Sequence, residues 1–250
     1  MDLETSWENT CKVLFGDGIG GLDEYDAYLS RHVKLPASGK SSISGKDIAV
    51  SSAVQKGAKF ISNDEMPEFE KNAGSTPFNI NEIKDIDSAI GALGERFCYS
   101  GNIQLGNCAG ISRSNKCIDA AFVNRSEYVY YSKYVSHSIM VRHSECVFGT
   151  VSTAEIKFGI KHFESWRSVR MLEAFRTYTS SDCYFVANVE SCQNCLFSFN
   201  LRNQSNCIGN LKLEKEKFSA LRDKLVADVR DTLRAKKSIP SIVDIVGDVS

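Results

Sequence analysis

A short repeat in residues 97–210 restricts the possible folds more than any other feature of the sequence. Four similar segments recur there about 18 residues apart, and their acidic members are Glu127, Glu145, Glu164 and Asp182. Short β-favouring runs alternate with Ser, Asn and Gly, and the segment contains no proline. Repeated short strands joined by polar turns predict a β-solenoid, in which each coil packs only on its neighbours.

A period of about 18 to 20 residues would divide this segment into about six coils. Equivalent residues would then stack in columns roughly 4.8 Å apart, so the four acids would form one column. Arg125, His143 and His162 each precede an acid by two residues, and residues i and i+2 share a face of a strand. The pattern predicts a neutralised surface ladder, with catalytic or calcium-binding carboxylates as the alternative.

The first 96 residues predict helices and short strands. Trp7, Cys11, Leu14 and Phe15 share one helical face, the stretch 5–8 fits a capping box, and Gly16 ends the helix. A second helix is expected from Leu22. Residues 36–80 predict short strands at DIAV and AKFIS and a turn at 64–67.

Two further helices are expected on either side of the repeat. Residues 81–96 predict a helix with Asn81 as its N-cap and with an apolar face, Ile83, Ile86, Ile90 and Leu93. Residues 211–237 predict a longer amphipathic helix that caps the last coil. The segment after Pro240 is apolar, and we expect it to dock on the same chain or on a partner.

These expectations define an α+β fold that is mainly β. It comprises an N-terminal helical and mixed region (1–96), a β-solenoid of short rungs (97–210), and a C-terminal capping helix with its tail (211–250).

The motif G-x-G-x-x-G occurs once, at Gly16, Gly18 and Gly21. A dinucleotide-binding fingerprint requires a strand before these glycines, whereas a helix is predicted here. The neighbouring acids would repel a pyrophosphate. The glycines therefore indicate a turn between two helices.

Composition is typical of a globular protein, with 42% hydrophobic and 24% charged residues and a net charge of −1. No apolar run approaches the roughly 18 residues of a membrane span, and the acidic start lacks a signal-peptide core. We therefore expect a cytoplasmic protein. Its nine cysteines, an odd number, indicate buried thiols or metal ligands rather than a disulfide scaffold.

The stretch after Cys192 contains C-x-x-C, then L-R-N, C-I-x-N and a Lys/Glu-rich helix. It resembles a group of uncharacterised cysteine-rich β-solenoid-like proteins of archaea and small-genome bacteria. The matching residues are Cys192, Cys195, Phe197, Leu201, Arg202, Asn203, Cys207, Ile208 and Asn210. In this chain Leu196 displaces the phenylalanine by one place. The resemblance implies a solenoid-like fold and no particular activity.

Two groups of residues are candidate sites. Four cysteines could form a zinc site, because thiolates are good zinc ligands, or could fill the coil interior as small hydrophobes; they are Cys183, Cys192, Cys195 and Cys207. A basic and aromatic patch could be a plain solvated face, or could bind a protein or single-stranded RNA; it comprises Lys161, Trp166, Arg167, Arg170, Phe175 and Arg176.

The sequence contains no convincing catalytic constellation. The favoured interpretation is a non-enzymatic interaction or scaffold protein, which uses the solenoid surface to bind a protein partner or itself. The alternatives are a structural zinc-binding module of a nucleic-acid or ribosomal assembly, and a β-helix carbohydrate-active enzyme.

Overall fold

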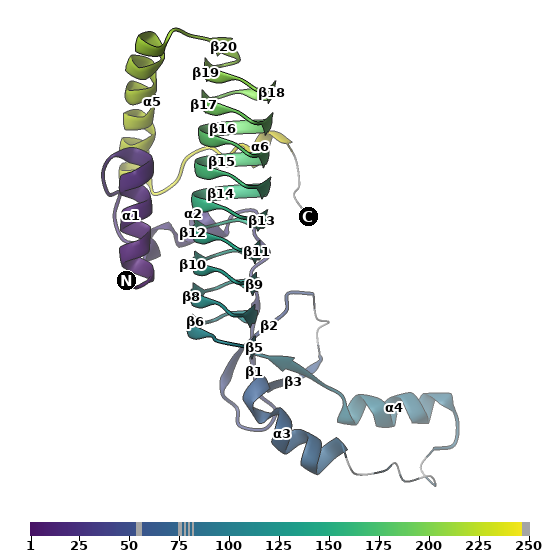
Figure 1. Cartoon of the computed structure of the whole chain (residues 1–250). Helices are drawn as coiled ribbons and strands as arrows, with labels where there is room; N and C mark the ends of the chain where they lie inside the picture. The colour runs from purple at the N-terminus through teal and green to yellow at the C-terminus, as the bar shows by residue number, and fades with distance from the viewer. Residues whose placement is uncertain (54–56, 75–76, 78, 80, 82, 247–250) are drawn as a thin grey trace.

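The computed structural model describes residues 1–53, 57–74, 77, 79, 81 and 83–246 (Figure 1). The chain is mainly β, with 40% strand and 29% helix, and its centre is a β-solenoid of about nine turns. The predicted fold class is therefore confirmed. One 16-stranded parallel sheet winds through the solenoid, and only its last short strand is antiparallel.

Each turn of the solenoid contributes one strand to each of two faces. Three longer strands run over both faces; they are β14 (Lys157–Trp166), β15 (Val169–Tyr178) and β16 (Ser181–Glu190). The first face also contains β6 (Ala109–Ser112), β8 (Ala121–Asn124), β10 (Lys133–Ser136), β12 (Glu145–Phe148), β17 (Gln193–Leu196) and β19 (Ser205–Ile208). The second face also contains β5 (Gln104–Leu105), β7 (Asn115–Ile118), β9 (Glu127–Tyr130), β11 (Ile139–Arg142), β13 (Val151–Ala154) and β18 (Phe199–Arg202).

The pairing register fixes the length of the repeat. Val135 lies beside Val123 and Val147, and Ser138 bonds to Thr150, 12 positions further along the chain. The expected period of about 18 to 20 residues and the expected count of six coils are therefore wrong. The spacing of the four acids is close to one and a half turns, so it places successive segments on opposite faces.

A period of three underlies this coil. Every third residue from Gly110 to Gly209 has a positive φ, and the residue that follows it points into the coil. From Ser114 to Ser198 all of these inward residues are buried. Each coil therefore has four inward positions, which are filled mainly by small side chains such as Val, Ser, Thr and Cys.

The buried serines complete the backbone hydrogen bonding between coils. The hydroxyl of Ser138 accepts a hydrogen bond from the amide of Thr150 (3.2 Å) and donates one to the carbonyl of Ser136 (2.8 Å). Ser126 bonds to Ser138 and Asn124 in the same way. Buried amides need partners, and these hydroxyls supply them where the strands are interrupted.

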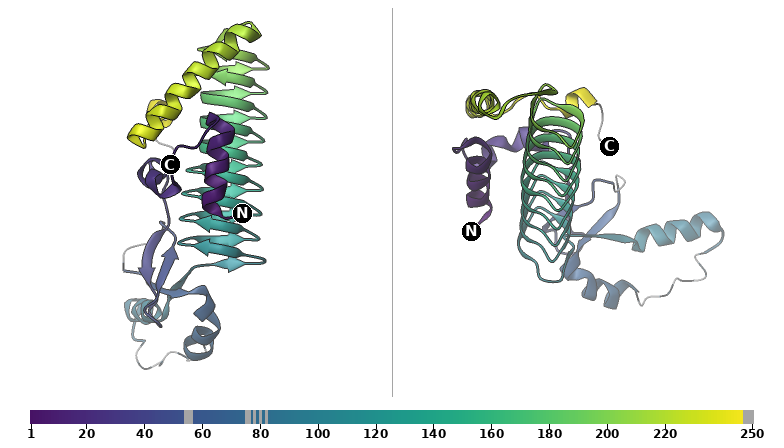
Figure 2. Two further views of the ribbon diagram at one scale, coloured as in Figure 1. Left: turned by 90° about the vertical axis from the view of Figure 1, so that its left-hand side faces the viewer. Right: turned by 45° about the horizontal axis from the view of Figure 1, so that its top comes forward.

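The N-terminal helix packs along the first face of the solenoid (Figures 1 and 2). α1 (Leu3–Phe15) is followed by a 3-10 turn, η1 (Leu22–Tyr25), and by α2 (Asp26–Ser30). The apolar side of α1 meets a column of solenoid side chains that includes Phe148, Ile160 and Leu172. The helical hairpin and the stop at Gly16 are confirmed, but the N-cap is Asp2 rather than the predicted box at Thr5.

The strands β1 to β4 lie at the end of the solenoid where β5 is found (Figure 1). An antiparallel pair, β1 (Ala37–Lys40) and β2 (Asp47–Val50), lies next to a parallel pair, β3 (Lys59–Ser62) and β4 (Cys98–Gly101). Both predicted strands are confirmed. The predicted turn at 64–67 is instead helical, because η2 (Asn63–Glu65) runs into α3 (Met66–Phe69) and η3 (Glu70–Gly74).

The helix predicted at 81–96 is α4 (Ile86–Arg96). It begins later than expected because Asp85, not Asn81, caps it through the amide of Ser88; Glu82 lies outside the described residues. The helix extends away from the solenoid (Figure 2).

The C-terminal helix is α5 (Lys215–Lys236), reached through the short strand β20 (Leu211–Lys212). It starts beside β19 at the last coil and runs back along the solenoid on the same side as α1 (Figure 2). Phe218, Val226 and Leu233 are its buried residues. A segment containing α6 (Val243–Val246) then crosses the edge of the solenoid. No helix in the described part of the chain is long and apolar enough to cross a membrane.

Candidate binding groove

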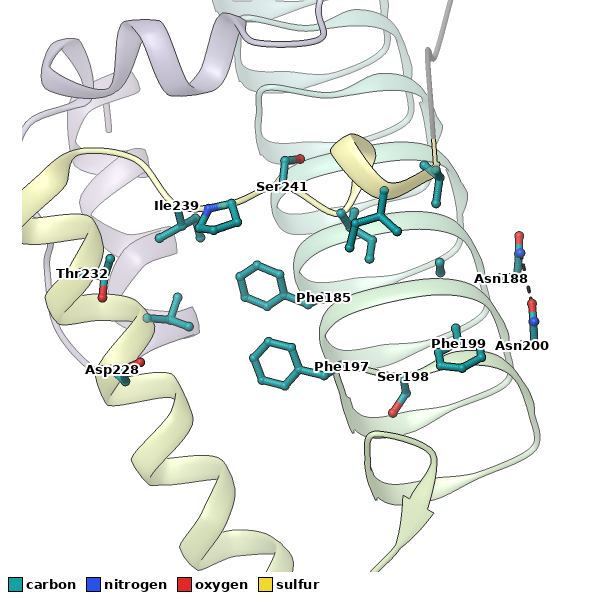
Figure 3. A pocket seen from close by; sticks show the side chains of 16 residues that line it. Phe185, Asn188, Phe197, Ser198, Phe199, Asn200, Asp228, Thr232, Ile239 and Ser241 are labelled. Carbon is teal, nitrogen blue, oxygen red and sulfur yellow. Dashed lines mark hydrogen bonds between the residues drawn. The ribbon is translucent and has the colours of Figure 1, made fainter.

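A groove of about 720 Å³ lies between the solenoid edge, α5 and the segment 239–246 (Figure 3). Its size falls in the range of ligand-binding sites. Its lining is mostly apolar and consists of Phe185, Ala187, Asn188, Phe197, Ser198, Phe199, Asn200, Asp228, Val229, Thr232, Ile239, Pro240, Ser241, Ile242, Ile245 and Val246.

Three phenylalanines give the groove its apolar surface. Phe185 and Phe197 occupy the same position in successive coils, and their rings stack with centroids 5.0 Å apart. Phe197 is 41% exposed and Phe199 is 56% exposed. Beside them, the amide of Asn188 donates to Asn200 (3.1 Å). Among the described residues that line the groove, Asp228 alone is charged.

The segment that closes the groove is held by a buried carboxylate. Glu173 accepts hydrogen bonds from the hydroxyl of Ser241 (2.6 Å), the amide of Ile242 (3.1 Å) and the hydroxyl of Tyr28 (2.6 Å). Val243 packs against Phe163 in a small cluster. The expectation that this tail docks on its own chain is confirmed for these residues, whereas 247–250 lie outside the described residues.

Lys161 lies one coil before Glu173 and is buried with it. Its ammonium donates to the carbonyl of Arg31 and lies over the rings of Tyr28 and Phe163. Burial lowers the pKa of Lys161 to about 8, although Glu173 opposes this shift. Burial raises the pKa of Glu173, against the effect of Lys161. The pair is therefore a structural link between the N- and C-terminal segments.

The structure does not bring the predicted basic and aromatic patch together. Lys161 and Phe175 are buried. Arg170 lies on the first face, whereas Trp166 and Arg176 lie on the second. The three arginines of the patch pair with acids one coil away, in the pairs Arg167–Glu155, Arg170–Asp182 and Arg176–Glu164.

The four cysteines of the predicted zinc site do lie together, inside the coil. Cys183, Cys195 and Cys207 form one inward column, and Cys192 packs beside them. Their thiols donate to the carbonyl two residues earlier, as the buried serines do. In the described part of the chain, no group of three or more His, Cys, Asp or Glu residues is arranged to hold a metal ion.

The thiol column affects the acidity of its members. Hydrogen bonding to Cys195 and burial raise the pKa of Cys183, and burial raises the pKa of Cys207. The neighbouring thiols, Cys183 first of all, lower the pKa of Cys195. The three sulfurs of the column therefore influence one another's acidity.

The predicted column of acids is wrong, because the true repeat is shorter than the spacing of the acids. Glu127 is buried on the second face and accepts a hydrogen bond from Asn115. Glu145 lies on the first face. Neutralisation by neighbouring cations occurs, as expected, but between successive coils: Glu164 pairs with Arg176, and Asp182 with Arg170.

One arrangement that the sequence did not reveal contains the residue types of a hydrolase triad, although the two ring nitrogens of the histidine have exchanged partners relative to a triad. Asp26 contacts Nε2 of His137 (2.7 Å), and Nδ1 of His137 contacts the hydroxyl of Ser136 (2.8 Å). Ser136 is fully buried, however, so a substrate has no access to its oxygen. These contacts fasten the start of α2 to the solenoid.

The glycines of the G-x-G-x-x-G motif serve the loop after α1. Gly16 is the left-handed C-cap of the helix, with φ of 79°. The amide of Gly21 donates to Glu24, and the carbonyl of Gly18 accepts from Arg234 on α5. Other groups of the protein already bond to these backbone atoms. The motif therefore forms the turn between the two N-terminal helical segments.

Sequence reasoning missed the groove as well. The visible signal was the recurrence of phenylalanine at 185 and 197, which are one coil apart. The alternation of Val and Ser at every third position from 123 to 147 would have given that repeat. The sequence matches no protein-family model and no curated protein.

Proposed function

We propose that this chain is a non-enzymatic interaction protein, which uses its solenoid to present a docking groove to a protein partner or to a second copy of itself. The observation that supports this is the apolar groove with its two half-exposed phenylalanines. Exposed apolar surfaces of this kind are typical of interaction sites, and aromatic side chains are enriched in binding hot spots.

The other two interpretations have less support. A zinc module binds its metal through thiolates, whereas Cys183, Cys192, Cys195 and Cys207 are buried and donate their thiol protons to backbone carbonyls. A β-helix glycosidase needs carboxylates on one face, and the acids at 127, 145, 164 and 182 alternate between faces.

The test compares three baits by affinity purification from the native host and mass spectrometry. Tyr178 is exposed and does not line the groove, so we expect the wild-type protein and Tyr178→Asp to recover the same partner. Phe197→Asp places a charge in the groove, so it should lose that partner. Equal recovery by all three baits, or recovery of nothing together with a strictly monomeric protein, would refute the proposal.

A further inference from the structure

α4 is an amphipathic helix that presents its apolar side to solvent. Ile86, Ile90 and Leu93 lie along one side at i, i+4 and i+7, and they are 76%, 61% and 50% exposed. None of the described side chains of α4 is buried. Helices shorter than about 12–15 residues are marginal in water without tertiary packing, and α4 has 11 residues.

The groove is the complementary feature. It is concave and apolar, whereas α4 is a convex apolar ridge with the anchor spacing of helix-in-groove recognition. Among the described lining residues only Asp228 is charged, so the fit between the two features rests on apolar side chains and shape.

The two features cannot meet within one molecule. α4 extends from the end of the solenoid where β4 and β5 lie, and the groove is formed near the other end by β16, β18 and α5 (Figure 1). We therefore propose that α4 of one copy docks in the groove of another copy. This rests on the proposed function and names a second copy of the chain as the partner.

Such a contact is heterologous, because each copy uses two different surfaces. It leaves a free α4 at one end of a dimer and a free groove at the other, so it adds copies head to tail into a chain or ring. α4 is only about 16 Å long at 1.5 Å per residue, and a standard interface buries about 800 Å² per partner. The association is accordingly weak and depends on concentration.

Sedimentation velocity of two complementary variants tests the proposal. Ile90→Asp disables the helix and leaves the groove intact; Phe197→Asp does the reverse. Both substitutions are at exposed positions, and circular dichroism verifies that each variant is folded. From micromolar to submillimolar concentration, the wild type and the control Tyr178→Asp should form species larger than dimers. Each variant alone should stay monomeric, and their equimolar mixture should form dimers and nothing larger.

Other outcomes would overturn the inference. A monomeric wild type excludes self-association through these surfaces. Loss of assembly in Ile90→Asp but not in Phe197→Asp indicates pairing of two α4 helices instead. A mixture of the variants that stays monomeric also refutes the helix-in-groove contact. If the wild type is monomeric but still captures a partner that Phe197→Asp loses, the proposed function stands and only this inference fails.

Discussion

The solenoid depends on residues that adopt a left-handed backbone conformation at every third position. Most of them are not glycine, although this conformation costs an ordinary residue roughly 1–2 kcal/mol. The fold tolerates this free-energy cost because the turn at each such residue directs the next side chain into the coil. The intrinsic backbone preferences of these residues therefore do not predict the coil geometry. In the sequence, the spacing of Val and Ser is the feature that indicates it.

Ser191 offers a direct test at this scale. It is exposed with φ of 51°, so Ser191→Gly should stabilise the protein by about 0.5–1 kcal/mol. Gln193→Gly, at an exposed strand position without a positive φ, should destabilise it by about 0.5–1 kcal/mol. Urea unfolding measures both. A loss of stability in Ser191→Gly would contradict the role assigned to this conformation.

At the scale of strands and helices, the sequence predicted the long amphipathic elements well. α1, α4 and α5 were expected because their apolar residues recur at helical spacing. The strands were expected as a class, but their register was not: the regularly spaced acids are conspicuous, whereas the buried serines that define the coil look like ordinary loop residues. The groove was missed because its walls come from residues 185–200, 228–232 and 239–246.

The buried serines should be essential to the coil. Ser138→Ala leaves the amide of Thr150 and the carbonyl of Ser136 without their partner, which costs about 1–3 kcal/mol. Ser138→Thr keeps a hydroxyl at this position and should cost less. Ser112→Ala, at an exposed position, should change stability by less than about 0.5 kcal/mol. Equal effects of Ser138→Ala and Ser112→Ala in urea unfolding would disprove this role.

At the scale of the whole molecule, the pair Lys161 and Glu173 joins three parts of the chain. Tyr28 comes from α2, Ser241 from the C-terminal segment, and both bond to Glu173 on the solenoid. Neither contact was predictable, because the residues are 145 and 68 positions apart and the sequence carries no signal for their pairing.

This pair should give stability a characteristic pH dependence. The pKa of Lys161 is about 8 in the folded protein and 10.5 in the unfolded chain. The unfolded chain therefore holds more protons between these values, and stability rises with pH across this window. For Glu173 the folded pKa is raised from 4.5, so stability falls as pH rises from 4.5 towards the folded value.

Unfolding by urea across this range would compare the wild type with Lys161→Met/Glu173→Gln. Between pH 8 and 10.5, the free energy of unfolding of the wild type should rise relative to that of the double variant. Removing both charges at the exposed pair Lys40 and Asp47 should leave the pH dependence of the free energy of unfolding unaltered. A wild type and double variant with parallel profiles would show that the buried pair does not titrate in this way.

The attachment of both chain ends to the middle coils sets an order on folding. Neighbouring coils contact one another across a sequence separation of a single turn, whereas α2 and the C-terminal segment must find Glu173 over far longer separations. Short-range contacts form faster because less chain entropy is lost in closing them. We therefore expect the coils to form before the two ends dock on them, so that the groove is among the last parts of the molecule to be completed.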